Sequence, residues 1–92
     1  MAETLEPAAV DDAIAGTDWT RDGDAIARDL DFDDFAAAMA HVNAVAEAAE
    51  EANHHPDILV HGWNKVRLTL STHSAGGVTQ ADVDMTRTLD AL

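Results

Sequence analysis

Three of the five histidines stand where their side chains could act together. Two are neighbours that precede a proline, in His54-His55-Pro56, and the third, His73, follows eighteen residues after His55. Imidazole is the only side chain whose ordinary pKa lies near neutrality, and it is also a common metal ligand. Acid–base catalysis, metal binding and a structural role at helix ends are therefore the three interpretations to weigh.

The spacing of the histidines disfavours a metal site. Neighbouring side chains point about 100° apart on a helix and to opposite faces on a strand, so His54 and His55 converge only because the chain bends at Pro56. The chain has no cysteine, which excludes a thiolate-zinc site, a disulfide and a cysteine nucleophile. We therefore expect no metal at these histidines.

Composition narrows the classes of partner. Eighteen acidic residues against five basic ones give a net charge of −13, which repels nucleic-acid phosphates, and Lys and Arg form no local cluster. Lys65 is the only lysine, and Asp outnumbers Glu, a pattern typical of proteins from a high-salt cytoplasm. No apolar run approaches the roughly 18–20 residues that span a bilayer, and the N-terminus lacks the features of a signal peptide. We expect a cytoplasmic protein that binds neither nucleic acid nor membrane.

Apolar periodicity predicts a single domain over residues 1–92, with residues 1–6 as a loose end. The fold expected is α+β, with three helices on one face of a four-stranded antiparallel sheet in the order helix, strand, strand, helix, strand, strand, helix. The predicted elements are a helix over 7–15, strands over 19–21 and 25–32, a helix over 34–52, strands over 58–63 and 66–70, and a helix over 80–92.

Three details of this pattern place the histidines. Pro56 ends the second helix, so His54 should lie at or just past its last turn and His55 should be extended. Alternation along the fourth strand puts His73 on the polar side, at or beyond the strand end. Thr79 and Asp82 form a capping box for the last helix. The second helix should pack on the sheet through an apolar stripe of Phe35, Met39, Val42, Val45, Ala46 and Ala49.

Two segments, 49–57 and 64–82, together resemble the pterin-4a-carbinolamine dehydratase family. The shared features are the paired histidines after a glutamate-bearing helix, a strand ending in Thr72-His73, the glycines Gly76-Gly77, and Thr-x-x-Asp at residues 79–82 opening a helix. Weaker similarity extends the match over most of residues 17–90. The resemblance implies the same element order and an assembly as a homodimer or a homotetramer.

The resemblance also implies an activity. Such enzymes dehydrate 4a-hydroxytetrahydropterin to quinonoid dihydropterin and water, with the pterin as substrate and no cofactor. The resemblance assigns proton transfer to His54 and His73, and the binding of the pterin mainly to His55. These catalytic roles could be exchanged among the three histidines.

Further candidate substrate-binding residues are Asp82, Thr72 and Glu50. Asp82 could orient His73 or bind the pterin, or it could only cap its helix. Glu50 is a candidate partner for His54, or a solvated charge. Two other functions stay open, a dimeric interaction or assembly-factor module on the same fold and a pterin-binding protein of molybdenum-cofactor metabolism.

Overall fold

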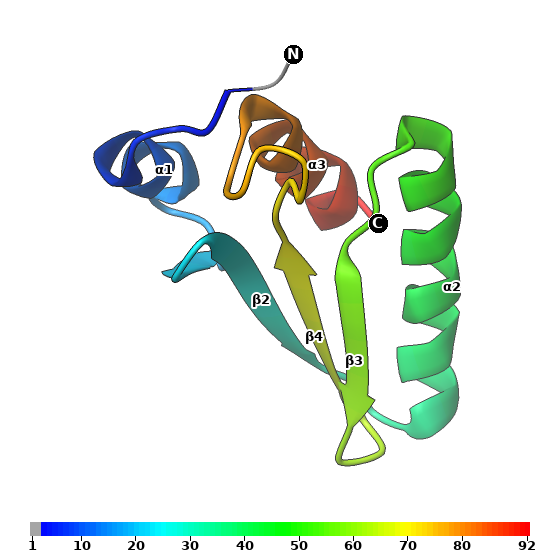
Figure 1. The fold of residues 1–92 in the computed structure, drawn as a ribbon. Helices are drawn as coiled ribbons and strands as arrows, with labels where there is room; N and C mark the ends of the chain where they lie inside the picture. Colours follow the sequence, from blue (N-terminus) through cyan, green and yellow to red (C-terminus); the bar gives the residue numbers. More distant parts are fainter. Residues whose placement is uncertain (1–2) are drawn as a thin grey trace.

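The computed structural model describes residues 3–92, with the seven elements in the predicted order (Figure 1). They are α1 (Pro7–Ile14), β1 (Thr20–Asp22), β2 (Ala25–Asp31), α2 (Phe35–Ala52), β3 (Asp57–His61), β4 (Lys65–Leu70) and α3 (Gln80–Asp90). The α+β fold class and the element order are confirmed.

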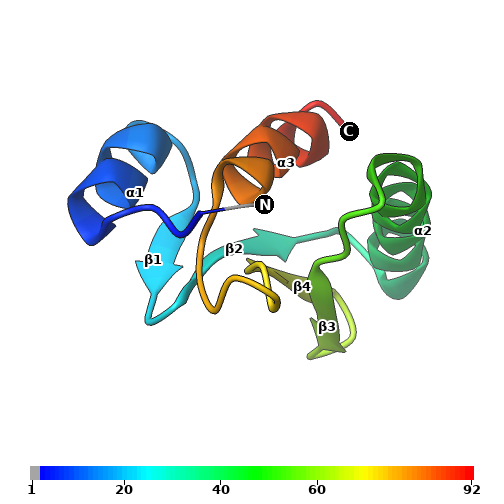
Figure 2. The same ribbon diagram turned by 45° about the horizontal axis from the view of Figure 1, so that its top comes forward.

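The four strands form one antiparallel sheet in the order β1-β2-β4-β3. β4 lies between β2 and β3, so that Leu68 pairs with Arg28 on one side and with Ile58 on the other. The three helices cover the same face of the sheet (Figure 2). The ends of α2 and β4 and the start of α3 thereby come to one end of the molecule, where His54, His55 and His73 lie.

The core lies between the sheet and the helices. Val66, Leu68 and Leu70 of β4 alternate with more exposed residues and are at most 1% exposed, as a strand with one buried face requires. Further core residues come from the other elements and from the segment before β1: Val10, Ile14, Trp19, Ile26, Val45, Val83, Met85 and Leu89.

The uncovered face of the sheet is polar and carries ion pairs. Arg67 of β4 contacts Asp29 of β2 at 2.8 Å and Asp22 of β1 at 3.1 Å. The two carboxylates raise the pKa of the Arg67 guanidinium, mainly through hydrogen bonds. These pairs keep the open face solvated, although exposed ion pairs of this kind add little stability.

The buried side of α2 differs from the predicted stripe. Asp34 caps the helix by accepting a hydrogen bond from the Ala37 N–H at 2.8 Å. The buried residues are Ala38, Val45, Ala48 and Ala49, whereas Phe35 is 54% exposed and Ala46 is exposed. The prediction was thus right for Val45 and Ala49 and wrong for Phe35 and Ala46, because the face made mainly of alanine lets the helix pack closely against its neighbours.

The hairpin between β3 and β4 is tighter than expected. β3 ends at His61 instead of Trp63, because Gly62 and Trp63 both adopt positive φ angles, 54° and 59°, in the turn. Positive φ is uncommon for a bulky residue. In this turn the Trp63 side chain points outward and is 63% exposed.

Of the segment expected to be loose, residues 1 and 2 lie outside the described residues. The remainder is attached to the fold, since the Leu5 N–H donates to the Val78 carbonyl at 2.8 Å. No helix within residues 3–92 is long and apolar enough to cross a membrane.

His41 of α2 should make stability depend on pH. Its ring packs on Phe32, with centroids 5.1 Å apart, and burial, followed by the positive charge of Arg28, lowers its pKa. The folded-state pKa of His41 lies below the unfolded value of about 6.5, so protonation of His41 favours the unfolded chain. The free energy of unfolding should therefore fall as the pH drops from about 6.5 through the lower folded-state pKa.

Replacing His41→Gln removes this titration. Denaturant unfolding of both proteins at about pH 8 and about pH 5.5, at constant salt, isolates the effect, since all other groups cancel in the difference. We expect the variant to gain stability relative to wild type at the lower pH. If the stability difference between His41→Gln and wild type does not change with pH, or changes in the opposite direction, the lowered pKa of His41 is contradicted.

Candidate active site

The site is centred on Asp82, in the first turn of α3. Its side chain is fully buried. One carboxylate oxygen, Oδ2, accepts the backbone N–H of Thr79 at 2.9 Å, so the predicted capping box is present. A buried carboxylate is costly unless it is fully hydrogen-bonded, so the remaining capacity of Asp82 must be filled from elsewhere.

The first outside partner is the hydroxyl of Thr72, which follows the end of β4. Thr72 Oγ1 donates to Asp82 Oδ2 at 2.8 Å and lies 2.8 Å from Thr79 Oγ1. Since its single proton goes to the carboxylate, Thr72 must accept from Thr79. The hydroxyl chain therefore joins the end of β4 to the start of α3.

The second outside partner is His54, just beyond the end of α2. His54 Nε2 lies 2.5 Å from Asp82 Oδ1, and the imidazole is 18% exposed. An ionised carboxylate can only accept hydrogen bonds, so we assign the proton to Nε2. In the neutral ring, Nδ1 is then left as a proton acceptor. Asp82 thus pairs with His54, and not with His73 as one of the sequence-based alternatives had it.

The end of α2 explains why His54 reaches Asp82. Asn53 takes a left-handed conformation, with φ 50° and ψ 41°, and its N–H donates to carbonyls of the last helical turn. The His54 N–H then closes on the Ala49 carbonyl at 3.1 Å. The bend predicted at Pro56 thus begins already at Asn53, which the sequence-based prediction missed, although Asn is, after Gly, the residue best suited to this conformation.

His55 and Glu50 form a separate, outer pair. Their Nε2 and Oε2 atoms lie 3.5 Å apart, with the side chains 56% and 78% exposed. Glu50 therefore lies beside His55, and the suggested pairing of Glu50 with His54 was wrong. A pair this exposed contributes little to stability, but it leaves the imidazole open to a ligand.

His73 stands on the turn that follows Thr72. The turn closes through the Thr72 N–H to the Gly77 carbonyl at 2.9 Å and the Gly76 N–H to the Thr72 carbonyl at 2.9 Å. The imidazole is exposed and makes no hydrogen bond or ion pair with residues 3–92. Its link to His54 runs through the adjacent Thr72 and through Asp82.

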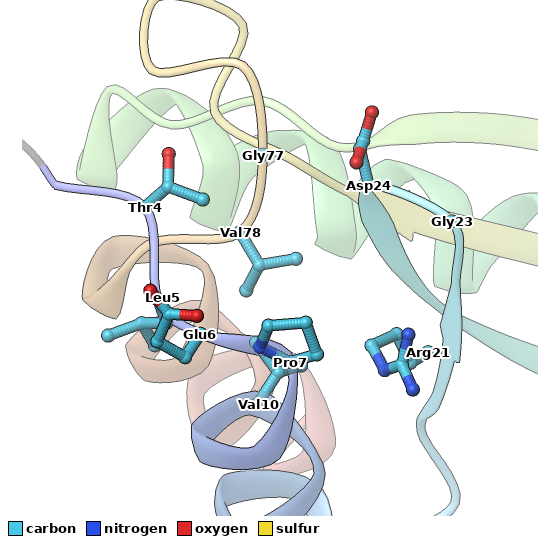
Figure 3. A pocket seen from close by; sticks show the side chains of 10 residues that line it. All are labelled: Thr4, Leu5, Glu6, Pro7, Val10, Arg21, Gly23, Asp24, Gly77 and Val78. Carbon is cyan, nitrogen blue, oxygen red and sulfur yellow. The ribbon is translucent and has the colours of Figure 1, made fainter.

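Two depressions mark the surface nearby. One, of about 220 Å³, lies between the end of α2 and α3 and is lined by Ala52, His54, Ala81, Asp84, Met85 and Thr88. The other, of about 270 Å³, lies between the N-terminal segment, α1, the β1–β2 turn and Gly77-Val78 (Figure 3). The larger one touches none of the predicted site residues, so His54 is the only one of them that lines either depression.

The histidines do not gather into a metal-binding group. Across residues 3–92, no cluster of three or more His, Asp or Glu side chains is arranged to hold a metal ion. His54 instead directs one ring nitrogen at Asp82. What the arrangement offers chemically is an imidazole fixed by a buried carboxylate, close in the fold to two exposed imidazoles.

Comparisons with known proteins point to one family. The family model for pterin 4 alpha carbinolamine dehydratase matches residues 3–92. A Nocardia farcinica protein, described as a candidate pterin-4-alpha-carbinolamine dehydratase, is 56% identical over 75 residues, 82% of this chain and 78% of the relative.

Two solved structures share the fold. A transcriptional coactivator/pterin dehydratase from Brucella melitensis is 33% identical over 97% of both chains, with a TM-score of 0.88. A pterin dehydratase-like protein identified as a RuBisCO assembly factor of the alpha-carboxysome is 25% identical over 83% of this chain and 89% of its own, with a TM-score of 0.68. The family match over residues 3–92 and the close relatives show that this chain belongs to the pterin-4a-carbinolamine dehydratase family.

Proposed function

We propose that the protein dehydrates 4a-hydroxytetrahydropterin to quinonoid dihydropterin and water by histidine acid–base catalysis. In this reaction the C–O bond at position 4a breaks, the hydroxyl leaves with an added proton as water, and a ring nitrogen of the pterin gives up a proton. Family membership supports the substrate class. The observation that carries the mechanism is the 2.5 Å contact between His54 and the buried Asp82.

The three histidines then take different roles. His54, with Nε2–H directed at Asp82, offers Nδ1 to accept the proton from the ring nitrogen. His73 is exposed to solvent, and we assign to it the protonation of the leaving hydroxyl. His55, beside Glu50 on the outer side, holds the pterin ring. Thr72 bonds to Asp82, and Asp82 bonds to His54, so both act on the pterin through that histidine.

The exposed apolar residues support a further part of the proposal, that the protein is a homo-oligomer. β3 is an edge strand, and such an edge offers unpaired backbone groups to another strand. Leu59 of β3 is 54% exposed and Trp63 of the adjoining hairpin is 63% exposed. Pairing of β3 with a second copy would bring neighbouring side chains of that copy beside Leu59.

The same surface favours a second candidate function, a dimeric interaction or assembly module. Its support is the exposed apolar surface at Phe35, Leu59 and Trp63, together with the similarity to a protein identified as an assembly factor. The buried His54–Asp82 pair favours the enzyme, because a contact surface has no use for an imidazole fixed in this way. Dehydration measurements separate the two functions.

We expect the wild-type protein to accelerate dehydration of a carbinolamine that an aromatic amino acid hydroxylase generates in situ, followed by absorbance in concentrated KCl. His54→Ala and His73→Ala should each lower the rate by about 10²–10⁴-fold, the usual contribution of a positioned acid or base. His61→Ala, which removes an exposed imidazole from the open face of the sheet, is the matched control. A wild-type rate equal to the spontaneous rate would exclude the proposed enzyme.

Asp82→Asn tests the anchor of His54. The amide keeps the size of the carboxylate but loses its charge, and a hydrogen bond to a charged group is worth about 1.5–3 kcal/mol. We expect kcat to fall by roughly 10- to 100-fold while the fold remains intact by circular dichroism. Asp12→Asn, an exposed carboxylate of α1, serves as control. Equal kcat in both variants would mean that Asp82 only caps its helix.

Assembly is tested by light scattering and sedimentation in concentrated KCl. A homo-oligomer should show at least twice the monomer mass of 9.8 kDa. Leu59→Asp should reduce that mass, whereas Leu92→Asp, a similarly exposed leucine at the C-terminus, should not. A wild-type protein that sediments as a monomer would rule out the homo-oligomer.

A further inference from the structure

The N-terminal segment is fastened to the turn that carries His73. Leu5 donates its backbone N–H to the Val78 carbonyl at 2.8 Å, and Thr4 donates its hydroxyl to the Ala75 carbonyl at 2.8 Å. These contacts join positions 71 or more residues apart in the chain. Figure 3 shows Thr4 beside Gly77, with Val78 directly below.

The side chain of Thr4 packs closely against Gly77. Gly77 is buried, and a Cβ atom added there would lie 2.8 Å from Thr4 Cγ2, a distance that real Cβ atoms essentially never show. Gly77 does not have a positive φ angle, so its backbone conformation is open to other residues. A larger residue at this position would therefore meet the side chain of Thr4 and have to displace it.

The position of His73 depends on the backbone of this turn. Its imidazole has no hydrogen-bond partner within residues 3–92, so no side-chain hydrogen bond fixes the ring and the backbone of residues 72–77 sets where it lies. At one end the turn is held by Thr72, through Asp82. At the other end it is held by Thr4 and Leu5, which bond to residues 75 and 78.

We propose that Thr4 and Gly77 form a latch, by which the N-terminal segment holds the turn 72–77 and positions the His73 imidazole for proton transfer. Thr4 is thus a positioning residue that touches no substrate. This inference rests on the proposed dehydratase function for its catalytic part, whereas the latch itself is a structural property that can be measured without substrate. Its signature is a local effect on the turn that leaves global stability nearly unchanged, because both Thr4 and its hydrogen bond are exposed.

The experiment compares four variants with wild type. Thr4→Val keeps the shape and removes the hydroxyl, Thr4→Ser keeps the hydroxyl and removes Cγ2, Gly77→Ala introduces the clash, and the double variant Gly77→Ala/Thr4→Ser removes the atom responsible for it. Thr20→Val, an exposed threonine of β1, is the control. Amide hydrogen exchange at Gly76 and Gly77 reports on the turn, kcat and KM report on the reaction, and Tm reports on global stability.

We expect Thr4→Val and Gly77→Ala to speed amide exchange in the turn about threefold to tenfold, the effect of losing one net hydrogen bond. In both, kcat should fall by a similar factor with KM and Tm near wild type. Thr4→Ser should behave as wild type, and the double variant should recover from Gly77→Ala. Recovery is the outcome that a merely disturbed fold would not give.

If Thr4→Val exchanges its turn amides at the wild-type rate and keeps the wild-type kcat, the latch is overturned. It is also overturned if adding Thr4→Ser to Gly77→Ala does not restore wild-type behaviour. Faster exchange with unchanged kcat would overturn its role in positioning His73. If wild type accelerates no dehydration, the proposed function fails, and with it the catalytic role of the latch. The exchange measurements alone then decide whether the segment holds the turn.

Discussion

The burial of one carboxylate governs how this fold is arranged around its candidate site. Asp82 is entirely removed from solvent, and such a charge costs several kcal/mol unless hydrogen bonds satisfy it. Its partners come from three places: the start of α3, the end of β4 and the end of α2. Because all three must be in place together, the burial of Asp82 fixes how these chain segments meet.

This requirement links stability to the candidate chemistry. The capping box needs a carboxylate for the Thr79 N–H, and the same carboxylate orients the His54 ring through its second oxygen. A helix cap on the surface would serve α3 equally well, since capping needs no burial. The burial of Asp82 is therefore explained better by its contacts with Thr72 and His54 than by the needs of the helix.

The sequence predicted the features that local rules determine. The pair Thr79 and Asp82 marked the start of the last helix, and the alternation over Val66 to Leu70 marked the buried strand. It failed where distant segments decide. Glu50 was a candidate partner for His54, but the left-handed Asn53 ends the helix and directs His54 towards Asp82.

The face of α2 shows the same limit from another side. Hydrophobicity ranks Phe35 above alanine, so the predicted stripe included it, yet the helix buries Ala38, Ala48 and Ala49 and leaves Phe35 at the surface. The distance at which a helix packs depends on the size of the facing side chains. The apolar periodicity does not determine that packing distance, because an alanine-rich helix has several apolar faces that could be buried.

His54 and His73 are held in different ways, and the difference suits the two proton transfers of the proposed reaction. Abstraction of a ring proton depends on fixed geometry, which the bond to Asp82 gives His54. An acid that must recover its proton after each turnover gains from contact with water, which His73 has. An exposed imidazole gives up the rigidity that burial would bring, so the turn beneath it must supply that rigidity instead. The contacts of Thr72 on one side and Thr4 on the other are placed to do this, since each holds the backbone of the turn and leaves the ring free.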